Sequence, residues 1–236
     1  RLKVKMTKLM EEGKISRKSR VCFVNDGSRD QTWSIIERLH EEDPLFSGIN
    51  LSRNRGHQNA LLAGLMTVRQ YADMAISMDA DLQDDIEACD AMIDKYYEGC
   101  DIVYGVRSAR VTDTWFKRTT AEGFYKIMDR FGAKIVYNHA DYRLMSKRAL
   151  DGLAEFGEVN LFLRGMVPLV GYPSDVVYYE RAERFAGESK YPLKKMVSFA
   201  MDGITSLSIE PIRMITTLGV VVFLFSLAIL VYSLIR

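Results

Sequence analysis

The sequence predicts an α/β fold built around a mostly parallel sheet. Short apolar segments alternate with segments of helical periodicity through the first half of the chain. Such alternation at short spacing is typical of parallel strands joined by crossover helices. Polar loops follow Val24, Leu51 and Met78, at the predicted carboxyl ends of three strands. Because ligands bind beyond these ends in parallel sheets, the three loops are predicted to serve one site.

The elements of the first half are predicted from the spacing of their apolar residues. Strands are predicted at Val21–Val24, Ile49–Leu51, Met74–Met78 and Asp101–Gly105. Helices are predicted at Arg1–Glu12, Thr32–His40, Ala60–Tyr71 and Ile86–Tyr97. The first helix is amphipathic, with one face formed by Leu2, Met6, Leu9 and Met10. A helix is an unusual first element for an α/β sheet.

The second half of the chain is less regular. Helices are predicted at Trp115–Phe131, Leu150–Phe156 and Leu161–Leu169. Strands are predicted at Asp141–Met145 and Asp175–Tyr179, and a polar loop containing glycine at Phe185–Tyr191.

Charge and cysteine content narrow the class of protein. The chain has 236 residues, enough for one sizeable domain with additional segments. Its formal net charge of +1 gives no general electrostatic reason to bind nucleic acid. Cys22, Cys89 and Cys100 lie on apolar segments without metal-ligand spacing. They are interpreted as reduced thiols that pack inside a cytosolic domain.

The C-terminal segment predicts a membrane anchor. Met214–Ile235 contains no charged residue and lies between Arg213 and Arg236. At about 1.5 Å per residue this helix would be roughly 33 Å long, enough to cross a hydrocarbon core of about 30 Å. The alternative, a buried globular helix, is disfavoured because the segment has no polar face. The preceding basic residues place the upstream chain in the cytoplasm by the positive-inside tendency: Lys194, Lys195 and Arg213.

A second amphipathic segment precedes this span. Pro192–Ile209 has apolar residues at helical spacing and two lysines near its start. It is predicted either as a helix on the membrane surface or as an ordinary packed helix. The predicted organisation is an α/β domain at 1–191, a surface helix at 192–212 and a transmembrane helix at 213–236.

The stretch Ile76–Asp85, ISMDADLQDD, begins as an apolar strand and ends in carboxylates. If the strand continues that far, two-residue alternation places Asp79 and Asp81 on the same side. Two neighbouring carboxylates repel each other when partly buried, and Mg²⁺ or Mn²⁺ would relieve that repulsion while also binding phosphate oxygens. Gln83 could reach the ion or its waters, whereas the other aspartates are predicted to cap the next helix: Asp84 and Asp85. The alternative is a solvated acidic loop.

Asp26 is a second candidate binding residue. It follows an apolar strand and precedes Gly27, where the backbone must turn. Its carboxylate could accept hydrogen bonds from a nucleotide base or ribose. The alternative is a turn-forming aspartate, with Ser28 and Asp30 capping the helix that follows.

Basic residues occur in several loops, and each is individually typical of a solvated surface. Some would bind phosphate if the loops share a metal–diphosphate site, because arginine binds phosphate through two parallel hydrogen bonds. These residues are Arg53, Arg55, Arg107, Arg110, Lys117, Arg118, Arg143, Arg181, Arg184 and Lys190. The histidines show no ligand spacing, and His57 is interpreted as a structural residue at a helix N-terminus.

Taken together, the motifs resemble a known family. VNDGSRDQT, LSRNRGHQNAL, MDADLQDD, ADYRLMS and RFAGESKYPL occur in this order before the predicted span. This order is similar to the polyprenyl-phosphate glycosyltransferases of glycosyltransferase family 2, which include dolichol-phosphate mannose synthases and bactoprenol glucosyltransferases. The resemblance implies a GT-A fold, a nucleotide-sugar donor, Mg²⁺ or Mn²⁺, a polyprenyl phosphate acceptor at the cytoplasmic leaflet, and inversion at the anomeric carbon. The family begins with a nucleotide-binding strand that this sequence lacks, so an N-terminal truncation is expected.

The resemblance also implies roles for individual residues. The donor would be bound by Asp26, Ser28, Arg53, Asp79, Arg184 and Lys190, and the metal by Asp79, Asp81 and Gln83. The acceptor phosphate would be bound by Arg107, Arg118 and Arg143. Asp141 stands in the segment beside the sugar and counts with Asp79 and Asp81 among the catalytic residues.

The chemistry does not require a strong base. A phosphate monoester has a second pKa of about 6 and is largely ionised at neutral pH. We therefore expect Asp141 to position the sugar or acceptor. UDP-glucose is the first expectation for the donor, with other UDP-hexoses and GDP-mannose open, and self-association is also open.

Three other classes of protein were weighed against this interpretation. A processive polysaccharide synthase would carry a Gln-x-x-Arg-Trp segment, which is absent. A dinucleotide dehydrogenase would carry Gly-x-Gly-x-x-Gly after a strand, which is also absent. A membrane-tethered, non-catalytic nucleotide-binding subunit is disfavoured by the intact pair of aspartates, but it stays open as an alternative because the first strand of the family is missing.

Overall fold

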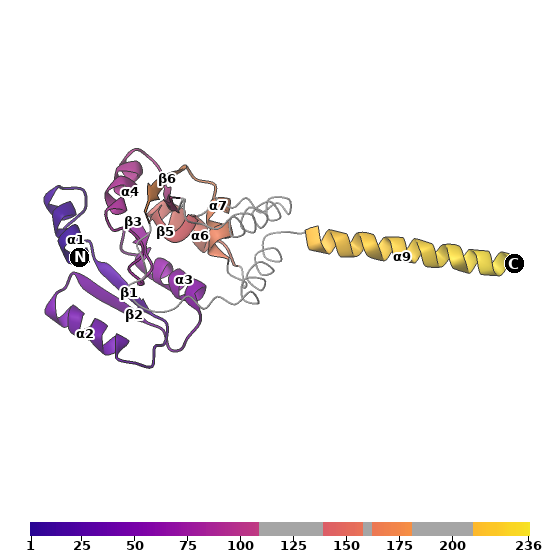
Figure 1. Cartoon of the computed structure of the whole chain (residues 1–236), viewed down its shortest axis with the longest axis horizontal. Coiled ribbons are helices and arrows are strands. Elements are labelled where there is room, and N and C mark those ends of the chain that lie inside the picture. Colours follow the sequence, from indigo (N-terminus) through magenta and orange to yellow (C-terminus); the bar gives the residue numbers. More distant parts are fainter. Residues whose placement is uncertain (109–138, 158–161, 181–209) are drawn as a thin grey trace. The chain divides into compact units, whose positions relative to one another are not determined.

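The computed structural model describes residues 1–108, 139–157, 162–180 and 210–236 (Figure 1). The chain divides into two units, Arg1–Asp113 with Val136–Lys190, and Thr114–Ile135 with Tyr191–Arg236. In the first unit the helices are α1 (Leu2–Glu11), α2 (Thr32–Glu42), α3 (His57–Val68), α4 (Ala88–Tyr97), α6 (Lys147–Ala154) and α7 (Leu163–Leu169). Its strands are β1 (Val21–Asn25), β2 (Phe46–Asn50), β3 (Met74–Ser77), β4 (Ile102–Arg107), β5 (His139–Ser146) and β6 (Ser174–Tyr179). The second unit contributes α9 (Glu210–Ile235).

The strands of the first unit form two sheets. β1 and β2 pair in parallel, and the second sheet has the order β3-β5-β4-β6. β5 runs antiparallel to both β3 and β4, whereas β4 and β6 are parallel. The α/β class is confirmed. The four-stranded sheet of the described residues is mixed, however, so the prediction of a mostly parallel sheet was only partly right.

The difference lies in the placement of β5. Helix α4 connects β3 to β4, and these strands run in the same direction, as the alternation predicted. β5 comes later in the chain and lies between them in the opposite direction. Periodicity identifies a segment as a strand but does not say which neighbours it pairs with, so this insertion was not predictable from the local pattern.

Apolar residues of β4, β5 and α4 form the core of the first unit. Leu144 of β5 is paired with Ile76 of β3 on one side and Val103 of β4 on the other. Met92 and Ile93 of α4 pack into the same buried cluster. Ile76 and Met78 pack against this cluster, which thereby fixes the end of β3, where the acidic loop begins.

The predicted helices and strands agree with the structure within a few residues. The second strand begins three residues earlier than predicted, at Phe46, and the helix predicted at Ala60–Tyr71 is found three residues earlier, at His57–Val68. The helix predicted at Trp115–Phe131, the loop at Phe185–Tyr191 and most of the surface helix at 192–212 lie outside the described residues.

α1 packs against the core as predicted, through Leu9. It also buries Lys5, which the sequence pattern did not indicate. The Lys5 ammonium forms ion pairs with Glu87 at 2.6 Å and with Asp90. These pairs join α1 to the first turn of α4, the helix that follows the acidic loop.

α9 is a long apolar helix in the second unit. Within it, Ile212–Ile235 spans 24 residues and is long and apolar enough to cross a membrane by length and composition. The helix predicted to span residues 213–236 is therefore present as a candidate span.

Candidate active site

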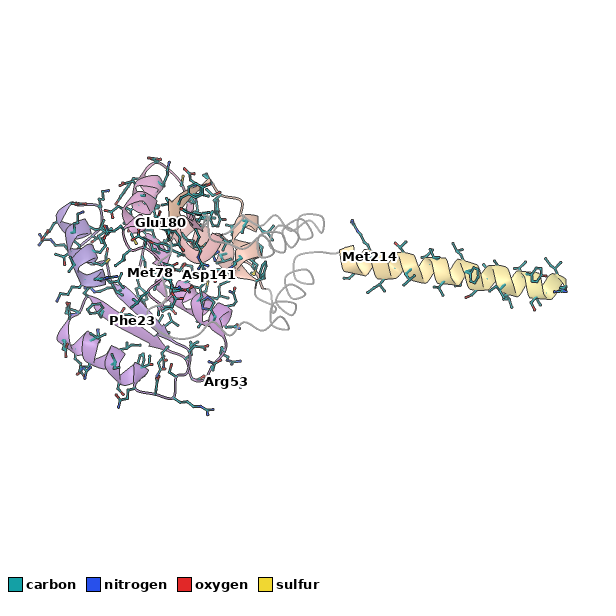
Figure 2. The ribbon with its side chains drawn as sticks, viewed as in Figure 1. Phe23, Arg53, Met78, Asp141, Glu180 and Met214 are labelled. Carbon is teal, nitrogen blue, oxygen red and sulfur yellow. The ribbon has the colours of Figure 1, made fainter. Side chains whose placement is uncertain are left out.

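The acidic loop begins directly after β3. β3 ends at Ser77, so Asp79 and Asp81 lie in the turn-rich segment before α4. The strand does not continue to them, so the condition for the alternation argument is not met and strand alternation does not place their side chains. Ser77 instead fixes the start of the loop, because its hydroxyl donates to the Asp141 carbonyl oxygen at 2.5 Å. Met78 and Asp141 consequently lie close together in Figure 2.

The loop is held by its own aspartates and by β6. The Asp81 carboxylate accepts the Gln83 amide at 3.1 Å, and Asp85 accepts the Glu87 amide at 3.0 Å. Asp84 is buried and does not cap α4, whose N-cap is Glu87 without a side-chain hydrogen bond. The prediction for Asp84 was wrong because its carboxylate accepts the Asp79 backbone amide and the hydroxyl of Tyr179 in β6.

Asp141 lies at the centre of a cluster of cationic side chains. It is 2% exposed and is the third residue of β5. Its Oδ1 accepts from Arg143 Nη2 at 2.6 Å, and its Oδ2 lies 3.0 Å from His57 Nε2. Arg164 of α7 donates to Oδ2 at 3.2 Å. Three elements of the fold, α3, β5 and α7, thus bring hydrogen-bonding nitrogens to one carboxylate.

The cluster fixes the protonation of Asp141. Burial alone would raise the pKa of Asp141, but the hydrogen bond with His57 and the charges of the two arginines outweigh it. The pKa of Asp141 therefore lies well below the usual range of an aspartate. A carboxylate with so low a proton affinity is a weak general base, which agrees with the expected positioning role.

His57 connects this cluster to the acidic loop. As the first residue of α3, it lies 3.0 Å from Asp141 and its Nε2 is 3.9 Å from Asp79 Oδ1. The hydrogen bond to Asp141 raises the pKa of His57, against the opposing effect of burial. Its side chain is 57% exposed, so the imidazole is at the surface of the site. The interpretation of His57 as a merely structural residue was incomplete.

The residues of the acidic loop fit a divalent cation that also binds phosphate. Burial raises the pKa of Asp79; His57 opposes this shift, whereas neighbouring carboxylates add to it. A cation beside Asp79 would relieve this repulsion. Within the described ranges, no three His, Cys, Asp or Glu side chains are grouped so as to hold a metal ion. Such a cation would therefore need further oxygen ligands, as Mg²⁺ does when it binds one or two carboxylates and substrate phosphates.

Asp26 brings together the loops after β1 and β2. Its carboxylate accepts the backbone amides of Arg55 at 2.6 Å and Gly56 at 2.9 Å. Gly27 has a φ of +65°, and a Cβ added there would lie 2.5 Å from the Arg53 backbone. Only glycine allows this close approach. Whether Asp26 binds a nucleotide base stays a prediction.

The remaining site predictions differ in outcome. Ser28 donates its backbone amide to Asn25, and Asp30 accepts the Thr32 amide at the start of α2. Arg143 is 1% exposed and paired with Asp141, so its predicted contact with a lipid phosphate does not agree with its burial. Arg107 Nε lies 3.4 Å from the Tyr179 hydroxyl. Three predicted residues lie outside the described part of the chain: Arg118, Arg184 and Lys190.

Comparison with known proteins identifies the family. The family model described as "Glycosyl transferase family 2" matches residues 12–153. The chain belongs to glycosyl transferase family 2. The predicted family is thereby confirmed, and the matched region contains Asp79, Asp81, His57 and Asp141.

Individual relatives of this family are closely similar. An uncharacterized glycosyltransferase of Bacillus subtilis (strain 168), YkoT, is 55% identical over 92% of this chain and 65% of its own length. A prophage bactoprenol glucosyl transferase homolog of Escherichia coli (strain K12) is 43% identical over 86% of this chain and 66% of its own. The bactoprenol glucosyl transferase of Shigella phage SfV shows the same identity and coverage. The chain thus spans about two thirds of the length of these relatives.

Proposed function

We propose that this protein transfers a hexose from a nucleotide-sugar, UDP-glucose or another UDP-hexose, to a polyprenyl phosphate with inversion at the anomeric carbon. One observation carries the proposal: His57 joins the acidic loop after β3 to the cation cluster around Asp141. The site thereby has an acidic side suited to a metal–diphosphate and a basic side suited to an anionic acceptor. The names of the relatives from Escherichia coli and Shigella phage SfV support glucose and bactoprenol as the substrates.

On the donor side, Asp79 and Asp81 would hold Mg²⁺ or Mn²⁺, with Gln83 as a further contact. The bound metal would neutralise charge on the departing nucleoside diphosphate. Gly27 and Asp26 keep the loops after β1 and β2 close together, and Ser28 and Arg53 lie in these loops. We assign this neighbourhood to the nucleotide.

On the acceptor side, the protein has to bring one anion close to another. A phosphate monoester carries about −1.5 to −2 charges at neutral pH and would be repelled by the acidic loop. Arg164 and His57, both held by Asp141, supply positive charge there, and Arg107 is held near the loop through Tyr179. Asp141 orients Arg164 and His57 and does not remove a proton. Arg143 supports Asp141 from the buried side.

The candidate span of α9 fits a lipid acceptor. It would hold the catalytic unit at the membrane surface, where the polyprenyl phosphate presents its head group. We place the catalytic unit on the cytoplasmic side, because Lys194, Lys195 and Arg213 precede the span.

The test is a donor screen with the full chain in detergent. UDP-glucose, UDP-N-acetylglucosamine and GDP-mannose are each incubated with undecaprenyl phosphate and Mg²⁺, and lipid-linked sugar is measured by mass spectrometry. UDP-glucose should give undecaprenyl phosphate linked to one hexose, with release of UDP. A product from GDP-mannose alone would reassign the donor, and nucleotide binding without any product would favour a non-catalytic subunit.

A further inference from the structure

Asp84 connects the acidic loop to the sheet. Its Oδ2 accepts the backbone amide of Asp79 at 3.3 Å, and its Oδ1 accepts the hydroxyl of Tyr179 at 2.6 Å. Tyr179 is the last residue of β6, is 3% exposed, and pairs with Arg107 in the register of β4 and β6. A continuous chain of hydrogen bonds therefore runs from a sheet strand to the backbone of Asp79.

The loop needs an external support of this kind. Leu82 lies in it with a φ of 60°, a left-handed conformation that costs a leucine roughly 1–2 kcal/mol. The hydrogen bond from the Gln83 amide to the Asp81 carboxylate is local and does not connect the loop to the sheet. The hydroxyl of Tyr179 comes from 95 residues away in the sequence and is fixed by the sheet. Such a strained loop keeps one conformation only where its surroundings determine it.

We propose that Tyr179, acting through Asp84, is a positioning residue that holds the Asp79 backbone in the conformation that binds a divalent cation. The inference rests on the proposed function, because it takes Asp79 as a metal ligand. It adds that the affinity for the metal depends on a tyrosine of β6 that touches neither the metal nor the substrates. Partners that orient a metal ligand typically change metal affinity by about 10–100-fold when they are removed.

Tyr142 provides a matched control. It is also buried, and its ring contacts that of Tyr179 edge to face at 5.2 Å between centroids. Its hydroxyl donates to the Asp85 carbonyl at 2.8 Å, on the same loop, and lies 3.2 Å from Cys89 Sγ. Tyr142→Phe thus removes a buried hydroxyl from the loop without removing the bond to Asp84.

The experiment measures Mn²⁺ binding in the presence of UDP by electron paramagnetic resonance, because the site needs phosphate oxygens as further ligands. Amide exchange of the acidic loop is measured by deuterium uptake, with the full chain in detergent. Tyr179→Phe should weaken Mn²⁺ binding at least about tenfold and speed exchange at Asp79. Tyr142→Phe should change Mn²⁺ affinity less than about twofold, although both variants lose a similar amount of thermal stability. Equal effects of the two variants on affinity, or none in Tyr179→Phe, would overturn the inference.

Two further variants distinguish loss of the Asp84 hydrogen bond from loss of the metal site itself. Asp84→Asn should weaken Mn²⁺ binding like Tyr179→Phe, because an amide cannot accept at both of its ends. If Asp84→Asn binds Mn²⁺ normally, the tyrosine acts through Arg107 and the inference fails. Asp79→Ala should abolish Mn²⁺ binding. Wild-type protein that does not bind Mn²⁺ would overturn the proposed metal site together with this inference, whereas normal binding in wild type and Tyr179→Phe alike would overturn the inference alone.

Discussion

Replacing Asp141 by asparagine should destabilise the first unit strongly. The change removes the negative charge opposite Arg143, which is 1% exposed. Among the described residues, the Arg143 guanidinium otherwise donates a hydrogen bond to the Leu163 carbonyl, at 3.4 Å. In the part of the chain that the structure describes, Arg143 Nε has no hydrogen-bond partner even in the wild type. Removing one partner of a buried ion pair costs about 3–5 kcal/mol, because the other charge stays buried without compensation. Against a typical total stability of about 5–15 kcal/mol, this loss is large but measurable.

The assay is urea unfolding of the detergent-solubilised chain, followed by tryptophan fluorescence. Asp151→Asn is the matched control, because its carboxylate pairs with Arg69 at the surface at 3.7 Å and should contribute less than about 1 kcal/mol. The double variant Asp141→Asn with Arg143→Met should recover at least about 1 kcal/mol, since it no longer buries an unpaired guanidinium. A loss below about 1 kcal/mol in Asp141→Asn, or no recovery in the double variant, would refute the reasoning.

Three further predictions concern turnover, the glycine after β1 and the Asp101–Arg148 ion pair. Asp141→Asn should lower turnover yet leave it measurable, and loss of all turnover with donor and acceptor binding intact would show that Asp141 is an essential base. Gly27→Ala should cost about 2 kcal/mol or more by thermal melting, because its Cβ would meet the Arg53 backbone at 2.5 Å. The hydrogen bond from Arg148 holds the pKa of Asp101 below that of an unfolded aspartate. The pair therefore stabilises the fold fully at pH values above the unfolded-state pKa. This stabilisation is lost as the pH falls through the lower pKa of the folded state. Asp101→Asn should therefore flatten the decline of melting temperature on acidification, and an unchanged decline would contradict this.

The local elements were predictable because their signals are local. Apolar spacing located α2 and α4 to within about two residues. The run of aspartates directly after β3 was also visible in the sequence. The order of motifs was sufficient to indicate the family. These features depend on residues close together in the sequence, where periodicity and turn chemistry act.

The partners of the site were not predictable in the same way. His57 is the first residue of α3 and directly follows the polar loop after β2. Its position beyond the carboxyl end of a strand was the one signal in the sequence that could have assigned it to the site. Arg164 and Tyr179 come from α7 and β6, far along the chain from the loop that they help to hold. Arg143 had the residue type of a phosphate ligand but faces the interior. The antiparallel insertion of β5, which brings Asp141 and Arg143 beside β3, is likewise a tertiary feature that local patterns do not contain.

The most direct test of the account measures release of UDP from UDP-glucose in the presence of undecaprenyl phosphate, with and without Mg²⁺. Wild-type protein should release UDP only with both Mg²⁺ and the lipid phosphate. The variant carrying Asp79→Asn and Asp81→Asn should be at least about 100-fold slower. Asp94→Asn, which changes an exposed aspartate paired with Lys14, should match the wild type. Full activity in the double variant would contradict the central claim that the acidic loop after β3 is the catalytic centre.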